Sequence, residues 1–172
     1  MGGEFAQFIE WRFYEELEWK LLDYEMHRKF QGYVKELNHF YRQEKALWEC
    51  DFLEKGFSWI EADNSGQSVL VFQRRAEDPS NNLVVVCNFA PVYHEKFRIG
   101  VPQPGFYQEV FNSDLPTYGG FGQINSKPLR AGKKKWQNQE YSLEMKMPSL
   151  AVVFLKLTKH TVGKSAHKNI EK

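Results

Sequence analysis

The sequence predicts a mainly β protein, in which a loop and one long α-helix lead into an antiparallel β-sandwich of about seven strands. The helix is predicted by apolar residues spaced three and four apart, which form a stripe on one helical face. These residues are Phe30, Tyr33, Val34, Leu37, Phe40 and Tyr41. After Cys50 apolar and polar residues alternate, and turn-forming groups such as Asp63-Asn64-Ser65-Gly66 separate the alternating stretches, which is typical of short antiparallel strands.

The helix is expected at about Tyr24 to Lys45. Gly32 lies inside this range, where a glycine costs about 1 kcal/mol relative to alanine. Residues 8–22 are rich in aromatic side chains, but their spacing fits neither a helix nor a strand. We therefore expect an ordered loop there, with room for one short helical turn.

The second part of the chain is expected to hold the strands. The valine-rich run that begins at Leu83 is apolar on both faces, which favours a central position in a sheet. Residues 112–139 are rich in glycine, proline and lysine and are expected to form a long loop, while residues 159–172 are expected to be a flexible tail. The expected strands are Phe57–Ala62, Ser68–Arg74, Leu83–Phe89, Tyr93–Ile99, Phe106–Phe111, Glu140–Lys146 and Leu150–Leu157.

Composition and charge argue against several classes of function. The 172 residues carry a net charge of +1, so we expect no binding of nucleic acid and no attraction to an anionic membrane. We expect neither a signal peptide nor a membrane-spanning run of about 18 apolar residues. The only cysteines, Cys50 and Cys87, give no disulfide framework, and reduced thiols in a cytoplasmic protein are the simpler interpretation.

Residue types and spacing alone predict no active site. No histidine has a second ligand at metal-binding spacing, so we expect no metal, and nothing indicates a cofactor. The carboxylates between Glu15 and Glu25 are neighbours on one segment, whereas glycoside chemistry needs two carboxyl groups about 5–10 Å apart across a sugar. The glycines after Tyr118 lack the lysine of a phosphate-binding loop. Aromatic residues make up 16% of the chain and suit either a core or stacking on sugar rings.

Six separated motifs carry more information than the composition, and together they cover about residues 1–157. They are MGGEFAQ (Met1–Gln7), Glu10-Trp11, LEWKLL (Leu17–Leu22), LNHFYR (Leu37–Arg42), GFSWI (Gly56–Ile60) and the loop pattern Asn112-Ser113-Asp114, Tyr118-Gly119-Gly120 and Asn125. In this order they resemble the C-terminal part of a 1,4-α-glucan branching enzyme of the α-amylase superfamily. The first motif resembles the end of the eighth strand of that family's (β/α)8 barrel.

The resemblance implies a transferase that cuts an α-1,4 bond in a glucan and passes the cut chain to a 6-hydroxyl, which forms the α-1,6 branches of glycogen. It implies a retaining mechanism with an Asp nucleophile and a Glu acid/base on earlier barrel strands. None of those motifs lies in this sequence, so we expect a piece of a larger protein without branching activity of its own. Residues 1–47 would be the end of the TIM barrel, with strand end, loop and helix, and residues 48–158 the C-terminal all-β domain.

Four residues are candidates for substrate contact and none for catalysis. By the resemblance, Glu4 and Gln7 would lie at the mouth of the barrel, where such barrels hold their active sites, although a structural polar contact fits them equally well. Trp11, like Trp19, would pack in the loop beneath that mouth or contact sugar. Trp59 is the candidate for stacking on glucan in the β domain, unless it belongs to the sandwich core.

The expected partners are an α-glucan, glycogen or starch, and the catalytic barrel of the parent chain. Without that barrel, the apolar stripe of the helix would fold onto the sandwich, pair with another copy or stay exposed, and we expect self-association. Two other interpretations remain open. One is a non-catalytic module that binds glycogen or starch, and the other is the end of a different α-amylase-type hydrolase or debranching enzyme.

Overall fold

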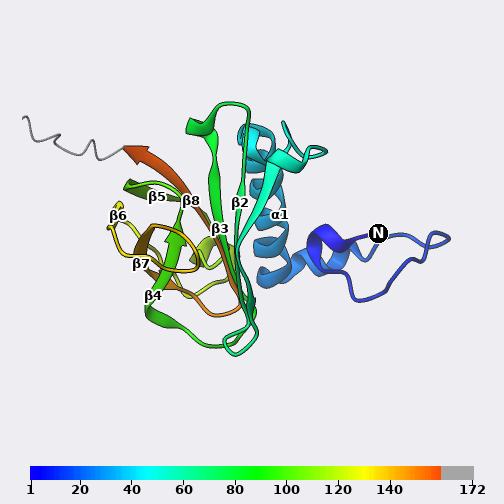
Figure 1. Cartoon of the computed structure of the whole chain (residues 1–172). Helices are drawn as coiled ribbons and strands as arrows, with labels where there is room; N and C mark the ends of the chain where they lie inside the picture. The colour runs from blue at the N-terminus through cyan, green and yellow to red at the C-terminus, as the bar shows by residue number, and fades with distance from the viewer. Residues whose placement is uncertain (160–172) are drawn as a thin grey trace, which may run out of the picture.

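The computed structural model describes residues 1–159, which form a projecting N-terminal segment, a long helix and a β-sandwich (Figure 1). The last strand extends to Lys159, so the predicted tail (159–172) begins inside a strand, and residues 160–172 lie outside the described residues. No helix within the described range is both long and apolar enough to cross a membrane.

The helix α1 (Glu25–Gln43) lies within two residues of the predicted bounds at each end. The turn before it is held by Arg28, whose guanidinium donates to the carbonyl oxygens of Leu22 and Asp23 at 2.7 and 2.6 Å. The helix ends at Glu44, where the backbone becomes extended with φ −91° and ψ 101°. The 3-10 turn η3 (Lys45–Leu47) follows, which is why the helix stops short of Lys45.

A six-stranded sheet forms the larger layer, in the order β1-β2-β3-β8-β5-β6. Every pairing in it is antiparallel, and β8, the last strand of the described residues, lies between β3 and β5. The valine-rich run that was predicted to be buried on both faces forms β3, which lies inside the sheet between β2 and β8. Its strands are β1 (Phe57–Asn64), β2 (Val69–Arg74), β3 (Leu83–Asn88), β5 (Gly105–Asn112), β6 (Leu129–Ala131) and β8 (Ala151–Lys159).

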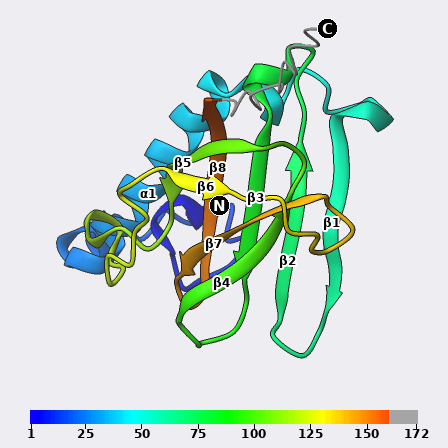
Figure 2. The ribbon, with the colours of Figure 1, turned by 60° about the vertical axis from the view of Figure 1, so that its left-hand side comes forward.

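A second, two-stranded sheet covers one face of the larger one (Figure 2). It pairs β4 (His94–Val101) with β7 (Tyr141–Met147) in antiparallel register. The main core lies between the two sheets and includes Val84 and Val86. Because side chains alternate along a strand, Leu83 and Val85 point to the opposite face of the larger sheet, and all six residues of β3 are buried.

The helix α1 covers that opposite face, so the larger sheet lies between α1 and the smaller sheet (Figure 1). The ring of Phe40 packs against Phe111 and Phe154 of the sheet, with centroid distances of 4.9 and 5.1 Å. The helix has therefore folded onto the sandwich, which is one of the three outcomes considered for its apolar stripe.

The predicted helix followed by an antiparallel sandwich is confirmed, but residues 1–159 form eight strands rather than about seven. The additional strand is β6, which lies in the region expected to be a loop, as does the 3-10 turn η6 (Pro116–Tyr118). A strand of three residues is too short for an alternating pattern to be recognised. It exists because its backbone pairs with β5, where Phe106 faces Arg130.

The N-terminal segment forms turns where the end of a barrel strand was expected. Residues 1–24, all of them described, contain two 3-10 turns, η1 (Gly3–Phe5) and η2 (Trp19–Asp23), and no strand. With no neighbouring strand, the backbone bonds locally, as in the 3.0 Å bond from the Gln7 N–H to the Gly2 carbonyl oxygen. The segment is joined to α1 by His27, whose Nδ1 donates to the Phe5 carbonyl oxygen at 2.8 Å.

Candidate functional site

Glu4 lies within η1 and Gln7 follows its last turn, but their side chains have different surroundings. Glu4 is exposed and borders an open groove of about 310 Å³ that Val34 and His39 of α1 also line. Gln7 uses both atoms of its amide inside the segment, since Oε1 accepts from the Glu18 N–H and Nε2 donates to the Ile9 carbonyl oxygen, each at 3.0 Å. Gln7 therefore orders the loop, and Glu4 is the side chain left open to a ligand.

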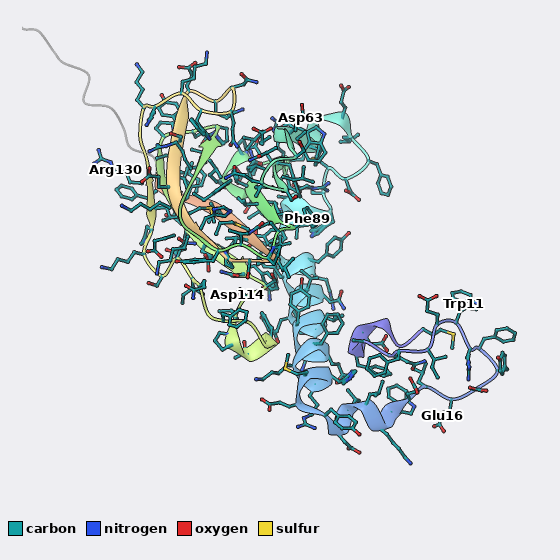
Figure 3. All side chains as sticks on the ribbon, turned by 90° about the horizontal axis from the view of Figure 1, so that it is seen from below. Trp11, Glu16, Asp63, Phe89, Asp114 and Arg130 are labelled. Carbon is teal, nitrogen blue, oxygen red and sulfur yellow. The ribbon has the colours of Figure 1, made fainter. Side chains whose placement is uncertain are left out.

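Trp11 and Trp19 occupy two different environments in the N-terminal segment. Trp11 is 74% exposed near the end of the segment that projects from α1 (Figure 3). Trp19 stacks on the buried ring of Phe5 at 5.4 Å and 28° between planes. Phe8, Phe13 and other rings of this segment are exposed as well. Trp19 therefore packs within the segment, whereas Trp11 belongs to an exposed aromatic surface.

Trp59 lies on the edge strand β1 and is 52% exposed. It packs edge-on against Phe57 at 4.9 Å and against Phe72 at 5.8 Å. Phe72 is the residue opposite Trp59 in the β1–β2 pair. We call Phe57, Trp59 and Phe72 the Trp59 patch. It is on the α1 side of the larger sheet, outside the core between the sheets.

The long loop after β5 is ordered by a buried carboxylate. Asp114 accepts hydrogen bonds from the backbone N–H groups of Phe121 and Gln123 at 2.9 and 2.8 Å. The chain closes on Gly120 so tightly that a Cβ there would lie 2.2 Å from the carbonyl oxygen of Asp114. Asp114 and Gly120 of the loop motif therefore have a structural role, because they fix the conformation of the loop backbone.

The same loop holds α1 against the sheet. Tyr118 of η6 packs edge-on against Tyr33 of α1 at 5.4 Å and stacks on Phe111 at 6.0 Å. At the other end of the loop, the Asn125 side chain donates to the Lys146 carbonyl oxygen at 3.0 Å and accepts from the Lys146 N–H at 2.8 Å. The loop motif thus connects the helix, β5 and β7.

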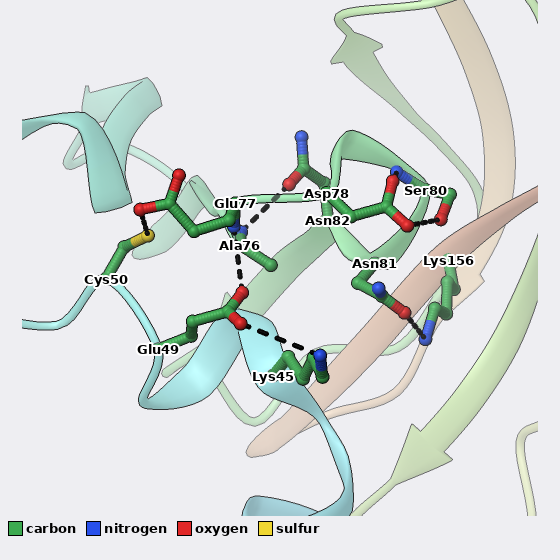
Figure 4. Close-up of polar contacts among 10 residues, drawn as sticks. All are labelled: Lys45, Glu49, Cys50, Ala76, Glu77, Asp78, Ser80, Asn81, Asn82 and Lys156. Atoms are coloured by element: carbon green, nitrogen blue, oxygen red, sulfur yellow. Dashed lines mark hydrogen bonds and ion pairs between the residues drawn. The ribbon is translucent and has the colours of Figure 1, made fainter.

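The two cysteines are free and buried, and neither provides a reactive thiol. Burial raises the pKa of Cys50, and the Glu77 carboxylate, which accepts from its thiol at 3.6 Å (Figure 4), raises that pKa further. Burial also raises the pKa of Cys87 to about 11. Since the thiolate is the nucleophile, both groups are held in their unreactive form. Within residues 1–159 no group of three His, Cys, Asp or Glu side chains is placed to hold a metal.

Sequence reasoning missed a polar cleft of about 290 Å³ beside β4. It placed residues 112–139 in a long loop and singled out neither Trp136 nor Gln137. The only signal was a tryptophan followed by the polar residues Gln137-Asn138-Gln139. We call this the Trp136 cleft, and its lining includes Glu61, Asn64, Gln67, Lys96, Trp136 and Gln137. Phe97 and Arg98 of β4 complete the lining.

Comparison with known proteins adds a family to this geometry. Residues 59–158 match the family described as alpha amylase, C-terminal all-beta domain. The chain is 51% identical to the 1,4-alpha-glucan branching enzyme GlgB of Halothermothrix orenii over 156 residues, which covers 91% of this chain and 25% of that protein. It is 48% identical to the 1,4-alpha-glucan branching enzyme GlgB 1 of Clostridium perfringens over 153 residues, 88% of this chain and 23% of that protein.

A third relative, the 1,4-alpha-glucan branching enzyme GlgB of Francisella tularensis subsp. novicida, is 44% identical over 92% of this chain and 25% of that protein. A solved alpha-amylase structure from H. orenii aligns with a TM-score of 0.45 at 16% identity, over 75% of this chain and 20% of that one. The chain spans about a quarter of the length of these curated relatives. Because the family match runs from Trp59 in β1 to Thr158 in β8 and so contains nearly all of both sheets, the chain belongs to the alpha-amylase C-terminal all-beta domain family.

Proposed function

We propose that the chain is the C-terminal part of a 1,4-α-glucan branching enzyme, whose whole protein transfers a cut α-1,4-glucan chain to a 6-hydroxyl and so forms α-1,6 branches. The observation that carries this proposal is the 44–51% identity to proteins of that name over about nine-tenths of the chain. The aligned stretch of 156 residues is longer than the β-domain match at residues 59–158, so it extends into the helix and the segment before it.

The β-sandwich would act as a support for the catalytic barrel of the parent chain, with α1 as the connecting element. This role is supported by the helix, which packs on the sheet through Phe40 and presents the N-terminal segment at its other end. That segment exposes Phe8, Trp11, Phe13 and Tyr14, each at least 69% exposed. A surface of this kind on a stable domain marks an interface, and the barrel is its proposed occupant.

The same exposed rings support self-association of the 172-residue chain on its own. Light scattering over a range of concentrations should show an average mass that rises above the monomer value. The triple variant Trp11→Ser, Phe13→Ser, Tyr14→Ser removes exposed rings whose one ring contact in the described structure is between Phe13 and Tyr14, and it should return the chain to monomer. A wild-type chain that stays monomeric at high concentration would contradict this expectation.

The proposed substrate contacts are Glu4 at the open groove and the Trp59 patch on the β domain, with Trp11 close to the barrel interface. For Gln7, the hydrogen bonds to Glu18 and Ile9 support an indirect role, in which its amide fixes the loop that carries Glu4. We also propose that the protein works in the cytoplasm on glycogen or starch. Two free, buried thiols support a reducing compartment.

The test of the function is product analysis with the whole protein that contains this chain. Amylose is incubated with the enzyme, and the ratio of α-1,6 to α-1,4 linkages is followed by proton NMR of the anomeric signals. We expect new α-1,6 linkages with no net rise in reducing ends. A rise in reducing ends without branches would indicate a hydrolase, loss of existing α-1,6 linkages a debranching enzyme, and glucan binding without any reaction a non-catalytic module. The 172-residue chain alone should give no turnover.

A further inference from the structure

We propose that the Trp136 cleft is a second binding site for α-1,4-glucan, separate from the Trp59 patch and on the other side of the larger sheet. The cleft is formed where the turn between β1 and β2, the middle of β4 and the turn before β7 meet. In Figure 2 the segment before β7 extends across β2 towards β1. The identity of the sugar rests on the proposed function, whereas the existence of the cleft and its chemistry do not.

A β-bulge in β1 separates the two sites. Trp59 lies opposite Phe72, but Glu61, two residues later, lies opposite the next residue of β2, Val71. Ile60 is therefore an additional residue in β1, and a bulge of this kind turns the following side chains to the other face. Trp59 and Glu61 would share a face of a regular strand, but because of the bulge they point to opposite sides. Trp59 faces the α1 side, and Glu61 faces the Trp136 cleft.

Trp136 is held in place by its own turn. It forms a hairpin with Gln139 through two backbone hydrogen bonds of 3.0 and 2.9 Å, and the intervening Gln137 and Asn138 both have positive φ. This turn lies directly on β4, because a Cβ at Gly100 would be only 2.5 Å from the Trp136 carbonyl oxygen. Gly100 also donates its N–H to Gln137 Oε1 at 2.8 Å. The indole is thus presented by a fixed backbone rather than by a free loop.

The indole is the exposed apolar surface of the cleft. Trp136 is 45% exposed, whereas Phe97, the other aromatic residue in the lining, is 6% exposed. An exposed indole face suits a ring with an apolar patch of C–H bonds on one side and polar groups around its edge, since the indole has an apolar face and a polar N–H. A pyranose ring has this shape.

The polar groups around the indole suit hydroxyls. Gln67 accepts from Asn64 through Oε1 at 2.8 Å, and Gln137 accepts from Gly100 through Oε1, so the Nε2 amino group of each remains a donor for a ligand. The charges of the cleft largely offset one another. Lys96 and the carboxylate of Glu61 both line the cleft, and Arg98 is paired with Glu144 of β7. A balanced site does not favour an anion or a cation, so the cleft selects a neutral polyhydroxylated ligand.

The volume of about 290 Å³ is at the lower end of the roughly 300–1,000 Å³ found for small-molecule pockets. One or two sugar rings fill it, and the rest of a glucan chain would extend into solvent. We expect binding in roughly the millimolar range, because such a contact removes water from only part of the ligand. A weak site of this kind serves a polymer well, since several weak contacts on one chain act together.

The test is a titration of the ¹⁵N-labelled 172-residue chain with maltoheptaose, followed by ¹H–¹⁵N NMR. The chain has five tryptophans, so the indole N–H signals report on Trp136 and Trp59 individually. We expect saturable shifts of the Trp136 indole, of the Gln67 and Gln137 side-chain amides and of the Gly100 N–H. In Trp136→Ala the shifts of those amides and of Gly100 should be lost, while Trp136→Phe retains part of them. Trp59→Ala should leave all of them unchanged.

Two results would overturn the proposal. One is a Trp136 signal that does not move while maltoheptaose saturates the Trp59 indole, and the other is an equal response to the β-1,4-linked cellohexaose. If Trp136→Ala unfolds, which its spectrum would show, Trp136→Phe and the wild-type amide shifts still decide the question. The proposed function fails separately, since a whole protein that makes no α-1,6 linkages can still bind maltoheptaose at Trp136.

Discussion

Lys156 of β8 and Glu44 at the end of α1 form an ion pair with 2.7 Å between Nζ and Oε2, and both side chains are mostly buried. Lys156 Nζ also lies 3.4 Å from Oδ1 of Asn81 in the turn before β3 (Figure 4). One lysine therefore joins the helix end, a central strand and a turn, at the place where the chain passes from the helix into the sandwich.

Glu44→Gln should lower the free energy of unfolding by about 1–3 kcal/mol, because it leaves the Lys156 ammonium mostly buried without its counter-charge. Urea unfolding followed by tryptophan fluorescence measures the change. Lys135→Ala is the control, since the Lys135–Glu140 pair is exposed and 3.9 Å apart, and its loss should change stability by less than about 0.5 kcal/mol. Equal effects of the two changes would contradict the role of the Glu44–Lys156 pair.

Phe40→Ala should separate α1 from the sheet. Its ring is buried between Phe111 and Phe154, so truncation leaves a cavity and should cost about 3–5 kcal/mol. Tyr41→Ala, one residue later and on the exposed side of the helix, should cost less than about 1 kcal/mol. Thermal unfolding by circular dichroism compares the two. If Tyr41→Ala proves the more damaging, the helix does not dock as described.

Gly120→Ala should disturb the loop that packs Tyr118 against α1, because the new Cβ meets backbone rather than a movable side chain. We expect a loss of about 1–3 kcal/mol in the free energy of unfolding. Gly132→Ala is the matched control, since a Cβ there has no neighbour within 4 Å. Chemical denaturation of both variants measures the difference, and a neutral Gly120→Ala would show that the loop adapts.

Stability should fall in alkaline solution because of two buried acidic groups. Burial raises the pKa of Tyr107 from 10.0 to about 12, and that of Cys87 from 9.0 to about 11. Both groups are neutral when protonated, so between these values the folded state keeps protons that the unfolded chain has lost. The stabilisation is fully present below about pH 9 and is lost as the pH rises through about 11–12.

Urea titrations at a series of pH values from about 8 to 11 test this dependence, with an expected decline of about 1–3 kcal/mol. Tyr107→Phe removes the hydroxyl that donates to the Gln103 carbonyl oxygen at 3.0 Å, so it is less stable at neutral pH, but its decline with pH should be shallower. Tyr24→Phe, with an exposed ring, should follow the wild type. Identical slopes for all three proteins would exclude Tyr107 as the cause.

Trp59→Ala should reduce the retention of the chain in native gels that contain glycogen. The loss of one stacking contact weakens binding by about 1 kcal/mol, or several-fold in the dissociation constant. Trp48→Ala, which removes another half-exposed indole, should leave retention unchanged. Unchanged retention of Trp59→Ala together with a lower unfolding temperature would instead assign Trp59 to packing with Phe57 and Phe72.

The elements that were predictable from sequence are those whose pattern is local. The stripe from Phe30 to Tyr41 located α1, and the uniform apolar run at Leu83 correctly indicated a strand with both faces covered. The covering elements were not predictable, because α1 on one face and β4–β7 on the other are set by contacts between distant residues. The strand β6 was missed for the same reason, since its three residues depend on β5.

In the candidate site, too, the features with a local pattern were predictable and those that depend on distant residues were not. The exposure of Trp59 was one of two readings of its alternation in β1, and the structure has it half exposed. The sequence did not indicate that Gln7 and Asp114 order their loops, because each side chain accepts hydrogen bonds from backbone groups several residues away. The Trp136 cleft could not be predicted from the sequence. It depends on a bulge at Ile60 and on contact between Gly100 and Trp136, and neither produces a periodic pattern in the sequence.

The central place of β8 has a consequence for synthesis on the ribosome. Until Ala151–Lys159 has left the exit tunnel, β3 and β5 each lack their shared neighbour, and both present unpaired backbone edges. Until β8 is available, these two edges must be kept from pairing with other chains, because unpaired strands readily join with them. A messenger RNA truncated just before Ala151 would therefore yield an aggregating product rather than a smaller folded domain, although only the last described strand would be missing.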